Sequence, residues 1–282
     1  MNEEKFITHK PINPTLTPYI SYYYFHSSRD HRLQKRFIYY PGFKNALTIY
    51  RNATVKFAPH YSQVVPDSNP NYVFIYSGMQ SHPRTADMVA PFDKIGIVFN
   101  ELGINHFAPQ PLGKISTHPI EKSFHYFGDD FTAYCRAVYA ENDTTTKVAL
   151  LDHFFATQLM GFQDHMLLKS IQTIHQSPQK LSVTNLSERL NTHRKTLLRL
   201  FQKHLVCSVK DYLDIVQFRK SLDDYFLFTQ QKISLTELAL KNDYYDQSQF
   251  IHHFQRLAGI NPKTFFQNVQ QVGKEATFWA LQ

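Results

Sequence analysis

The chain has 282 residues, enough for about two domains of ordinary size. Hydrophobic residues make up 43% and charged residues 19%, so buried cores can form and disorder throughout the chain is excluded. The net charge is +7, and the two cysteines, Cys135 and Cys207, are too few for a disulfide framework or a four-cysteine zinc site. With no apolar stretch of transmembrane length and no hydrophobic leader at the N-terminus, a cytoplasmic protein is expected.

The first part of the chain is predicted to form strands. Five segments rich in aromatic and β-branched residues alternate with prolines and glycines. These segments are 19–25, 37–40, 46–50, 72–76 and 95–99. Short strands without long helical patterns between them indicate a β-barrel or sandwich, so we expect a β-rich domain over residues 1–122.

The hydrophobic period becomes helical near residue 123. Val148, Leu151, Phe155 and Leu159 form one apolar stripe, which predicts a helical connector over 123–163. The stripe is either internal packing, which we favour, or a contact in a homodimer. Residues 164–273 are expected to form an all-helical domain, starting with a helix over 164–176, and residues 274–282 a C-terminal tail. The fold class expected for the whole chain is therefore α+β.

The helical part carries an internal repeat. Phe201-Gln202-Lys203 lines up with Phe254-Gln255-Arg256, an offset of 53 residues (254 − 201). Each copy reads as a short apolar helix, a tight turn and a second helix with a polar face, which is the helix-turn-helix pattern. In the first copy the turn is Asn191-Thr192, and Thr192 is expected to cap the following helix.

The outer faces of the two second helices, at about 193–204 and 246–256, are the candidate DNA-binding residues. They are Arg194, Lys195, Leu198, Arg199, Gln202 and Lys203 in the first copy, and Gln247, Gln249, His252 and Arg256 in the second. A helix fits the major groove, where Arg and Gln can read guanine and adenine and Lys contacts phosphates. The segment 210–228 is expected to be a spacer helix that separates the two readers by about one duplex turn, roughly 34 Å.

The charge distribution agrees with this assignment. Residues 180–220 hold nine Lys and Arg against three Asp and Glu. A local basic surface indicates a polyanionic partner, most simply nucleic acid. A solvated basic face without a partner is the alternative that charge alone leaves open.

Residues 180–270 resemble the AraC-type bipartite DNA-binding domain. The match rests on Leu197-x-Arg199-x-Phe201, Ser208 with Tyr212, Ile233-x-x-x-Glu237-Leu238-Ala239, Asp246-Gln247-Ser248-Gln249-Phe250 and Phe254-x-x-x-x-Gly259-Ile260-Asn261-Pro262. The N-terminal part is similar to the cupin-like sensor domain of some AraC-like regulators, through Pro14-x-Leu16-x-x-Tyr19-Ile20 and Gly96-Ile97-Val98-Phe99 with Gly103. The resemblance implies a transcription regulator that binds double-stranded promoter DNA, acts on RNA polymerase and responds to a small-molecule effector at the N-terminal domain.

The sequence departs from this family at four informative positions. The family's glycine after the first recognition helix is Val206, and the capping serine of that helix is His193. The glycine of the second turn is Asp243, which can still adopt a left-handed conformation. The arginine exposed on the second recognition helix is His252. We therefore expect the first module to supply most of the DNA affinity.

Other classes of function have weaker support. The histidines of the N-terminal half lack the His-x-His spacing of metal-binding cupins, and no phosphate-binding glycine loop or nucleophile elbow occurs, so no metal, cofactor or catalytic residue is expected. Some DNA-repair methyltransferases carry a similar helical unit, but their zinc site needs four cysteines. An adaptor protein whose helices no longer read DNA remains the alternative. In the β-rich domain, Tyr39, Tyr50, Tyr76 and Phe99 either fill the core or line an effector pocket.

Overall fold

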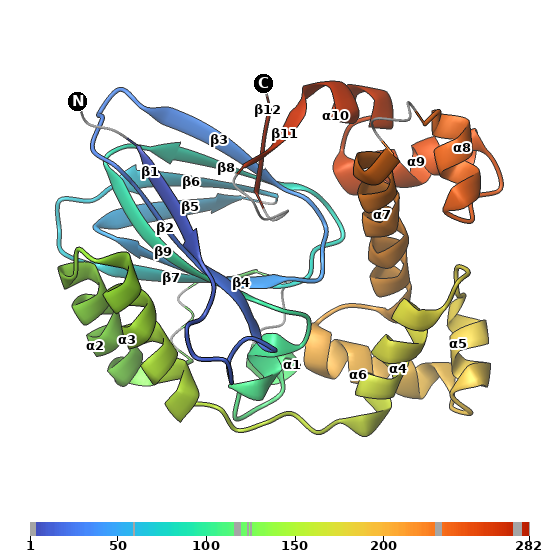
Figure 1. Cartoon of the computed structure of the whole chain (residues 1–282), viewed down its shortest axis with the longest axis horizontal. Coiled ribbons are helices and arrows are strands. Elements are labelled where there is room, and N and C mark those ends of the chain that lie inside the picture. The colour runs from blue at the N-terminus through green and yellow to red at the C-terminus, as the bar shows by residue number, and fades with distance from the viewer. Residues whose placement is uncertain are drawn as a thin grey trace. The chain divides into compact units, whose positions relative to one another are not determined.

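The computed structural model describes residues 4–58, 60–115, 120–122, 124, 126–228, 233–272 and 278–281. The chain forms two compact units. The first, called the β unit, comprises residues 1–37, 43–78 and 85–162; the second, called the helical unit, comprises 38–42, 79–84 and 163–282. The α+β class expected from the sequence is confirmed, with a β-rich N-terminal part and a helical C-terminal part (Figure 1).

The first sheet belongs to the β unit and is antiparallel where adjacent strands pair, in the order β1-β2-β9-β4-β7-β10. Its strands are β1 (Lys5–His9), β2 (Ile20–Ser28), β4 (Asn45–Arg51), β7 (Tyr72–Ser77), β9 (Phe92–Phe99) and β10 (Ile120–Lys122). The register is continuous along β4 and β9, from Asn45 opposite Phe99 to Arg51 opposite Asp93. This alignment sets alternate side chains of both strands on one common face.

The second sheet contains β3 (Gln34–Tyr39), β8 (Arg84–Val89), β6 (Tyr61–Pro66) and β5 (Ala53–Ala58), in that order. All five predicted strands are confirmed, as β2, β3, β4, β7 and β9. The strands β1, β5, β6, β8 and β10 were not predicted from the sequence. Between the two sheets, His26 of β2 packs edge-on against Phe37 of β3, with ring centroids 5.6 Å apart.

Three of the four aromatic residues expected in a core or pocket are buried: Tyr50, Tyr76 and Phe99. Tyr76 stacks on Phe124 at 5.1 Å, and Phe99 packs against Phe155 at 5.7 Å. Aromatic burial of this kind removes a large apolar area from water for each ring. Tyr76 and Phe99 therefore fill the core, whereas Tyr39 is only partly buried.

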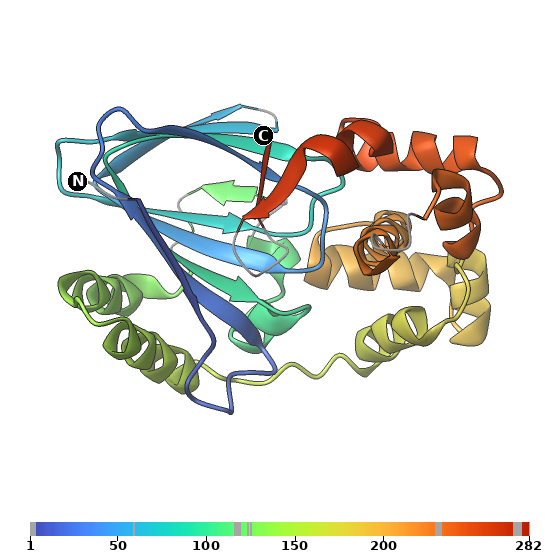
Figure 2. The same ribbon diagram turned by 45° about the horizontal axis from the view of Figure 1, so that its top comes forward.

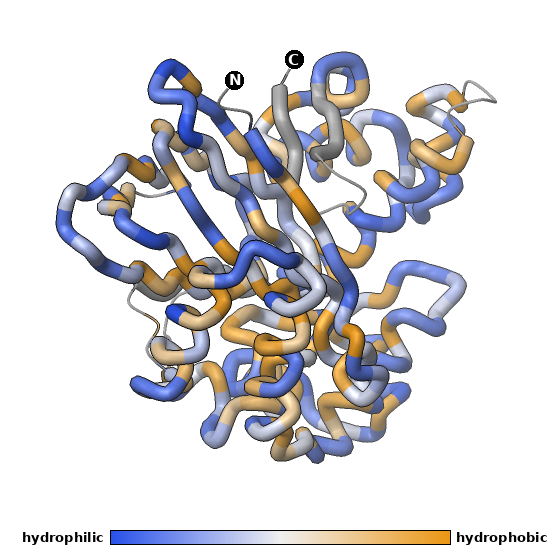
Figure 3. The backbone as a smooth tube through the Cα atoms, turned by 60° about the vertical axis from the view of Figure 1, so that its left-hand side comes forward, coloured by the Kyte–Doolittle hydropathy of each residue, from blue (hydrophilic) through white to orange (hydrophobic). Residues whose placement is uncertain are grey.

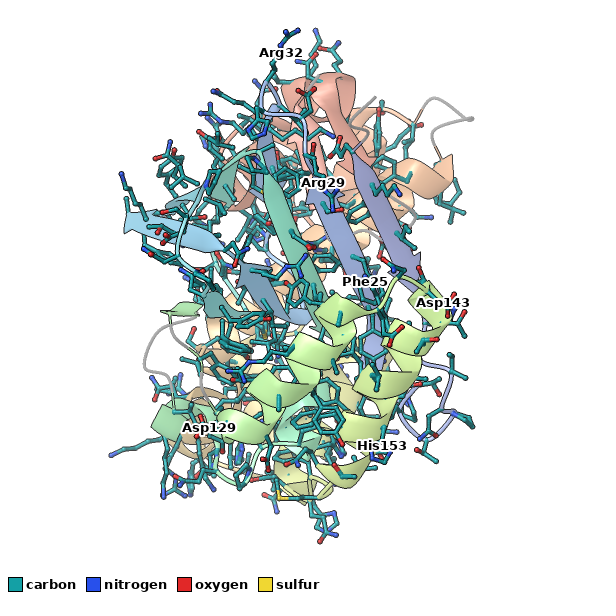
Figure 4. The ribbon with its side chains drawn as sticks, turned by 90° about the vertical axis from the view of Figure 1, so that its left-hand side faces the viewer. Phe25, Arg29, Arg32, Asp129, Asp143 and His153 are labelled. Carbon is teal, nitrogen blue, oxygen red and sulfur yellow. The ribbon has the colours of Figure 1, made fainter. Side chains whose placement is uncertain are left out.

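Two helices, α2 (Gly128–Ala140) and α3 (Thr144–Thr157), cover one side of the β unit (Figure 4). Asp143 caps α3, because its carboxylate accepts a hydrogen bond from the Thr146 N–H at 2.7 Å. In the first turn of α3, the Lys147 ammonium lies 5.3 Å from the centre of the Phe25 ring of β2. In the expected apolar stripe, Val148, Leu151 and Phe155 are fully buried, which confirms internal packing. Leu159 follows the end of the helix.

The helical unit has one long helix between two groups of shorter ones. The helix α7 (Val209–Phe228) has α4 (His165–Gln176), α5 (Val183–Arg189) and α6 (Arg194–Leu205) at one end. At its other end lie α8 (Leu235–Lys241), α9 (Gln247–Ala258) and α10 (Pro262–Asn268) (Figures 1 and 2). At 1.5 Å per residue, the 20 residues of α7 span about 30 Å. This length agrees with the spacer helix expected from the sequence.

The chain changes between apolar and polar residues every few positions along its length, as Figure 3 shows. In the second group of helices the apolar positions form one core, which includes Phe250, Phe254 and Phe265. Ile38 and Tyr40, from the short N-terminal segment that belongs to the helical unit, pack into the same core. Arg219 of α7 holds this segment, because its guanidinium donates hydrogen bonds to the carbonyl oxygens of Tyr40 and Pro41.

The C-terminal end also contains two short strands, β11 (Val269–Val272) and β12 (Phe278–Leu281), and β12 pairs with β3 at Trp279 and Ile38. Of the segment expected as a tail, residues 274–277 and 282 lie outside the described residues. Cys135 is buried, and burial raises the pKa of its thiol to about 12; Cys207 is partly buried. Even α7, the longest of the described helices, lacks the sustained apolar character that a membrane span needs.

Candidate nucleic-acid interface

The first module consists of α5, a turn and α6. Ser182 caps α5 through a capping box with Asn185, in which each side chain satisfies the other's backbone N–H. The helix stops because Asn191 adopts a left-handed conformation, with φ of 47°, and the chain then turns into α6. The turn predicted at Asn191-Thr192 is confirmed. The expected cap at Thr192 is wrong, because the N-cap of α6 is His193.

The candidate residues of α6 lie together on its solvent face. Leu197, Phe201 and Leu205 are buried, whereas the predicted outer residues are exposed. The exposed residues are Arg194, Lys195, Leu198, Arg199, Gln202 and Lys203. Within the described part of the chain, no hydrogen bond or ion pair engages the four cations of this face. Four unengaged cations on one helix face are suited to phosphate and base-edge contacts.

The N-terminus of α6 adds to this positive surface. His193 makes no side-chain hydrogen bond to the first backbone N–H groups of the helix. Those N–H groups and the helix dipole favour an anion such as a DNA phosphate. The first turn of α6 contains no acidic residue that would oppose such an anion.

The end of α6 is strained. Val206, where the resembling family has glycine, is the C-cap residue and has φ of 57° and ψ of 29°. For a residue with a Cβ this left-handed conformation costs roughly 1–2 kcal/mol, and a β-branched side chain is especially unfavourable there. Val206 therefore occupies a backbone conformation that glycine adopts most easily.

We therefore expect Val206→Gly to raise the free energy of unfolding by about 1 kcal/mol, because glycine adopts this conformation without a Cβ clash. Urea denaturation followed by circular dichroism measures the change. Val206→Ala is the matched control, since it removes the branched side chain but keeps the Cβ, and we expect a smaller gain. A Val206→Gly protein less stable than the wild type would contradict the prediction.

The second module repeats the arrangement with α8 and α9. Ser234 caps α8 through a capping box with Glu237. Asp243 ends the helix in the left-handed conformation expected from the sequence, with φ of 57°. Asp246 caps α9, and its carboxylate accepts a hydrogen bond from the Gln249 N–H at 2.7 Å. A carboxylate therefore occupies the N-terminus of α9, in contrast to the uncapped N-terminus of α6.

The candidate residues of α9 are mostly engaged within the helical unit. The Gln247 side-chain oxygen accepts a hydrogen bond from the Thr236 hydroxyl at 2.8 Å, and the Gln249 oxygen accepts from the Tyr245 N–H at 2.9 Å. The Arg256 guanidinium donates to the Asp214 carboxylate of α7 at 2.8 Å. His252 is exposed. The face of α9 is therefore less basic and more committed to internal contacts than the face of α6.

One exposed residue beside α9 was not among the sequence-based candidates. Tyr245 precedes the N-cap of α9 and is 87% exposed. Its backbone N–H is bound by Gln249, which fixes the turn around it. An aromatic residue in the turn before a helix with a polar face is the sequence signal that could have identified Tyr245.

No metal centre is indicated among the described residues of the whole chain. Among the described residues, no group of three or more His, Cys, Asp or Glu side chains could hold a metal ion. Two histidines of the N-terminal half, His118 and His125, lie outside those residues.

Comparison with known proteins agrees with the helix-turn-helix assignment. Residues 186–268 match a family model described as a helix-turn-helix domain. No curated protein matches the chain. The solved structures that resemble it include ToxT from Vibrio cholerae, with 11% identity over 93% of this chain and 97% of that chain and a TM-score of 0.43. Another is an unsaturated fatty acid-bound ToxT from the same organism, with 11% identity, coverage of 98% and 100%, and a TM-score of 0.45.

Proposed function

We propose that this chain, which carries an AraC-type helix-turn-helix domain at residues 186–268, is a transcription regulator that binds promoter DNA through two helix-turn-helix modules. The observation that carries the proposal is the exposed face of α6, with four cations that no hydrogen bond or ion pair engages among the described residues. A basic face that only meets solvent would not require a second helix-turn-helix module repeated at a constant offset along the chain. The α7 helix, about 30 Å long, separates the two modules by close to one duplex turn.

Binding to a promoter fragment at several salt concentrations tests the proposal against the adaptor alternative. Each phosphate that a protein cation neutralises contributes about −0.9 to the slope of log affinity against log salt. We expect a slope of about −3 or steeper from the cations of α6, together with clear preference over random DNA. A flat slope without sequence preference would favour the adaptor.

The two recognition helices are expected to contribute unequally. Arg199→Ala should weaken binding by roughly 10-fold to 100-fold, the range for loss of an arginine that contacts a base. His252→Ala should cost less than about threefold, because the neighbouring candidates on α9 are engaged in internal contacts. Gel-shift titration at fixed salt measures both variants, and equal losses would contradict the asymmetry.

Control by a small ligand is the second part of the proposal, and we place it in the β unit at Lys94 of β9. This side chain is 1% exposed and its ammonium lies 5.0 Å from the centre of the Phe37 ring and 5.6 Å from that of Tyr24. Buried ionisable groups with perturbed pKa values are frequent at binding sites, and an anionic ligand would favour the protonated form of this amine. A ligand that raises the melting temperature of the wild type but not of Lys94→Met would support this site.

The resemblance further implies action on RNA polymerase, and we include this partner in the proposal. A homodimer would also allow more half-sites to be bound, but it would use a surface other than the buried stripe of Val148, Leu151 and Phe155. The domain match favours a regulator over an enzyme.

A further inference from the structure

The second module also contacts the loop that leads into α5 of the first module, apart from the connection through α7. The backbone N–H of Lys180, in the loop between α4 and α5, donates a hydrogen bond to the Asp243 carboxylate at 2.8 Å. The Lys180 ammonium also lies 5.8 Å from the centre of the Tyr244 ring. The loop that leads into the first module is thereby attached to the turn of the second, within one compact unit.

The turn itself does not need the Asp243 carboxylate. The turn closes through backbone hydrogen bonds, from the Asp243 N–H to the Leu240 carbonyl and from the Tyr244 N–H to the Ala239 carbonyl. Glycine adopts a φ of 57° more easily than aspartate does. Aspartate at this position therefore has a conformational cost that glycine would avoid, and the turn would still close. The contact with Lys180 gives the side chain a separate role.

The first module supplies an internal comparison. Asn191 occupies the equivalent turn position and is also left-handed, and its N–H donates to the Glu188 carbonyl at 3.0 Å. No hydrogen bond from its side chain to the second module occurs within the described residues. The bridge between modules is thus a property of Asp243 and not of this turn type.

The second module is held to α7 by other contacts. The Asp214 carboxylate of α7 accepts from Arg256 of α9 at 2.8 Å, and the Gln217 amide donates to the Asn242 carbonyl at 2.9 Å. The first module is held to the start of α7, where Tyr212 packs on Phe201 at 5.2 Å. The Lys180–Asp243 bond closes a loop of contacts from one module through α7 to the other and directly back.

We propose that Asp243 is a positioning residue that fixes the separation and rotation of α6 and α9, so that the protein accepts DNA half-sites at one spacing only. A single helical connection can bend or twist at its ends, whereas a second contact away from the helix restricts both motions. The proposal rests on the DNA-binding function proposed above. Its ligand is duplex DNA with two half-sites, and each added base pair rotates one half-site by about 34° relative to the other.

The test uses the full chain and duplexes that the wild type selects from a random DNA pool. Versions with one or two base pairs inserted between the half-sites give the spacing dependence. We expect a two-base-pair insertion to weaken wild-type binding by roughly 30-fold, comparable to a mismatched site, and Asp243→Gly binding by less than about fivefold. Asp243→Asn keeps an acceptor oxygen and should retain the wild-type dependence. Asn191→Gly, the matched turn substitution in the first module, should also retain it.

A measurement without DNA separates this inference from the proposed function. Amide hydrogen exchange of Lys180 should be at least about tenfold faster in Asp243→Gly than in the wild type or Asn191→Gly, because the N–H loses its acceptor. Unchanged exchange, or an unchanged spacing dependence in Asp243→Gly, would overturn the positioning role. A different result would refute the DNA-binding function instead. In that case the wild type selects no DNA from the pool, while the Lys180 amide still exchanges more slowly in the wild type than in Asp243→Gly.

Discussion

Replacing Asp152 with alanine is expected to lower the free energy of unfolding of the β unit by about 3 kcal/mol, the usual scale for leaving buried hydrogen-bond donors without an acceptor. Asp152 of α3 is 4% exposed. Its carboxylate accepts hydrogen bonds from the backbone N–H groups of Ile12 and Asn13 and from the Tyr23 hydroxyl, each at 2.7 Å. Burial, followed by the nearby Asp152 carboxylate, raises the pKa of Tyr23, so the phenol remains a proton donor at neutral pH.

Asp143→Ala is the matched control on the same helix. Asp143 is an exposed N-cap residue, and its loss should cost only about 1 kcal/mol. Urea denaturation of the two variants measures the difference. Asp152→Asn should fall between them, because an amide oxygen replaces some but not all of the accepted bonds. An Asp152→Ala loss no larger than that of Asp143→Ala would contradict the buried role.

Lys94→Met is expected to stabilise the β unit at pH 7 by a few kcal/mol. Burial, partly offset by Glu4 and reinforced by Lys35, lowers the pKa of Lys94 from its ordinary value to about 7. Each pKa unit corresponds to about 1.4 kcal/mol of difference between the protonated and neutral forms. Methionine has a similar unbranched shape and carries no charge to desolvate, and its thioether suits the aromatic surroundings of this site.

The gain in stability from Lys94→Met should decrease as the pH rises. Above the ordinary lysine pKa both the folded and unfolded states are neutral, so the folded protein carries no penalty. As the pH falls from about 10.5 to about 7, the unfolded chain gains a proton that the folded chain binds less well, and wild-type stability decreases relative to Lys94→Met. Below about 7 both states are protonated and the difference is constant.

Thermal denaturation of both proteins between pH 7 and pH 10 measures this difference. Lys56→Met, an exposed substitution on β5, should change stability by no more than about 0.5 kcal/mol at any of these pH values. A Lys94→Met gain that does not shrink as the pH rises would contradict the assignment.

Local sequence patterns predicted the larger elements of the fold well. The predicted strand 95–99 lies within β9, because aromatic and β-branched residues mark a strand that is buried along nearly its whole length. Strands β5 and β8 were not identified, since fully buried residues are not continuous along them and each contains polar residues, two of six positions in β5 and three of six in β8. Such strands form through their pairing with neighbours, which a single segment of sequence does not contain.

The candidate nucleic-acid interface was likewise predicted only where local sequence patterns decide the structure. Helical periodicity correctly separated the buried face of α6, with Leu197 and Phe201, from its exposed basic face. On α9, the same reasoning placed Arg256 outward, but its partner Asp214 lies 42 positions earlier in the sequence. The sequence also indicated that Asp243 could turn left-handed, and gave no sign of its bond to Lys180, 63 positions away.

The sequence by itself determined that the chain has a β-rich part, a repeated helix-turn-helix and one helix with an exposed basic face, because hydrophobic period, turn residues and local charge are properties of neighbouring residues. Only the tertiary structure decided which polar side chains remain available to a partner, through Asp214 with Arg256 and Asp243 with Lys180. It also decided that Asp152 and Lys94 would be buried. Periodicity tells which way a side chain faces from its own helix or strand, but the atoms it meets belong to elements far away in the chain.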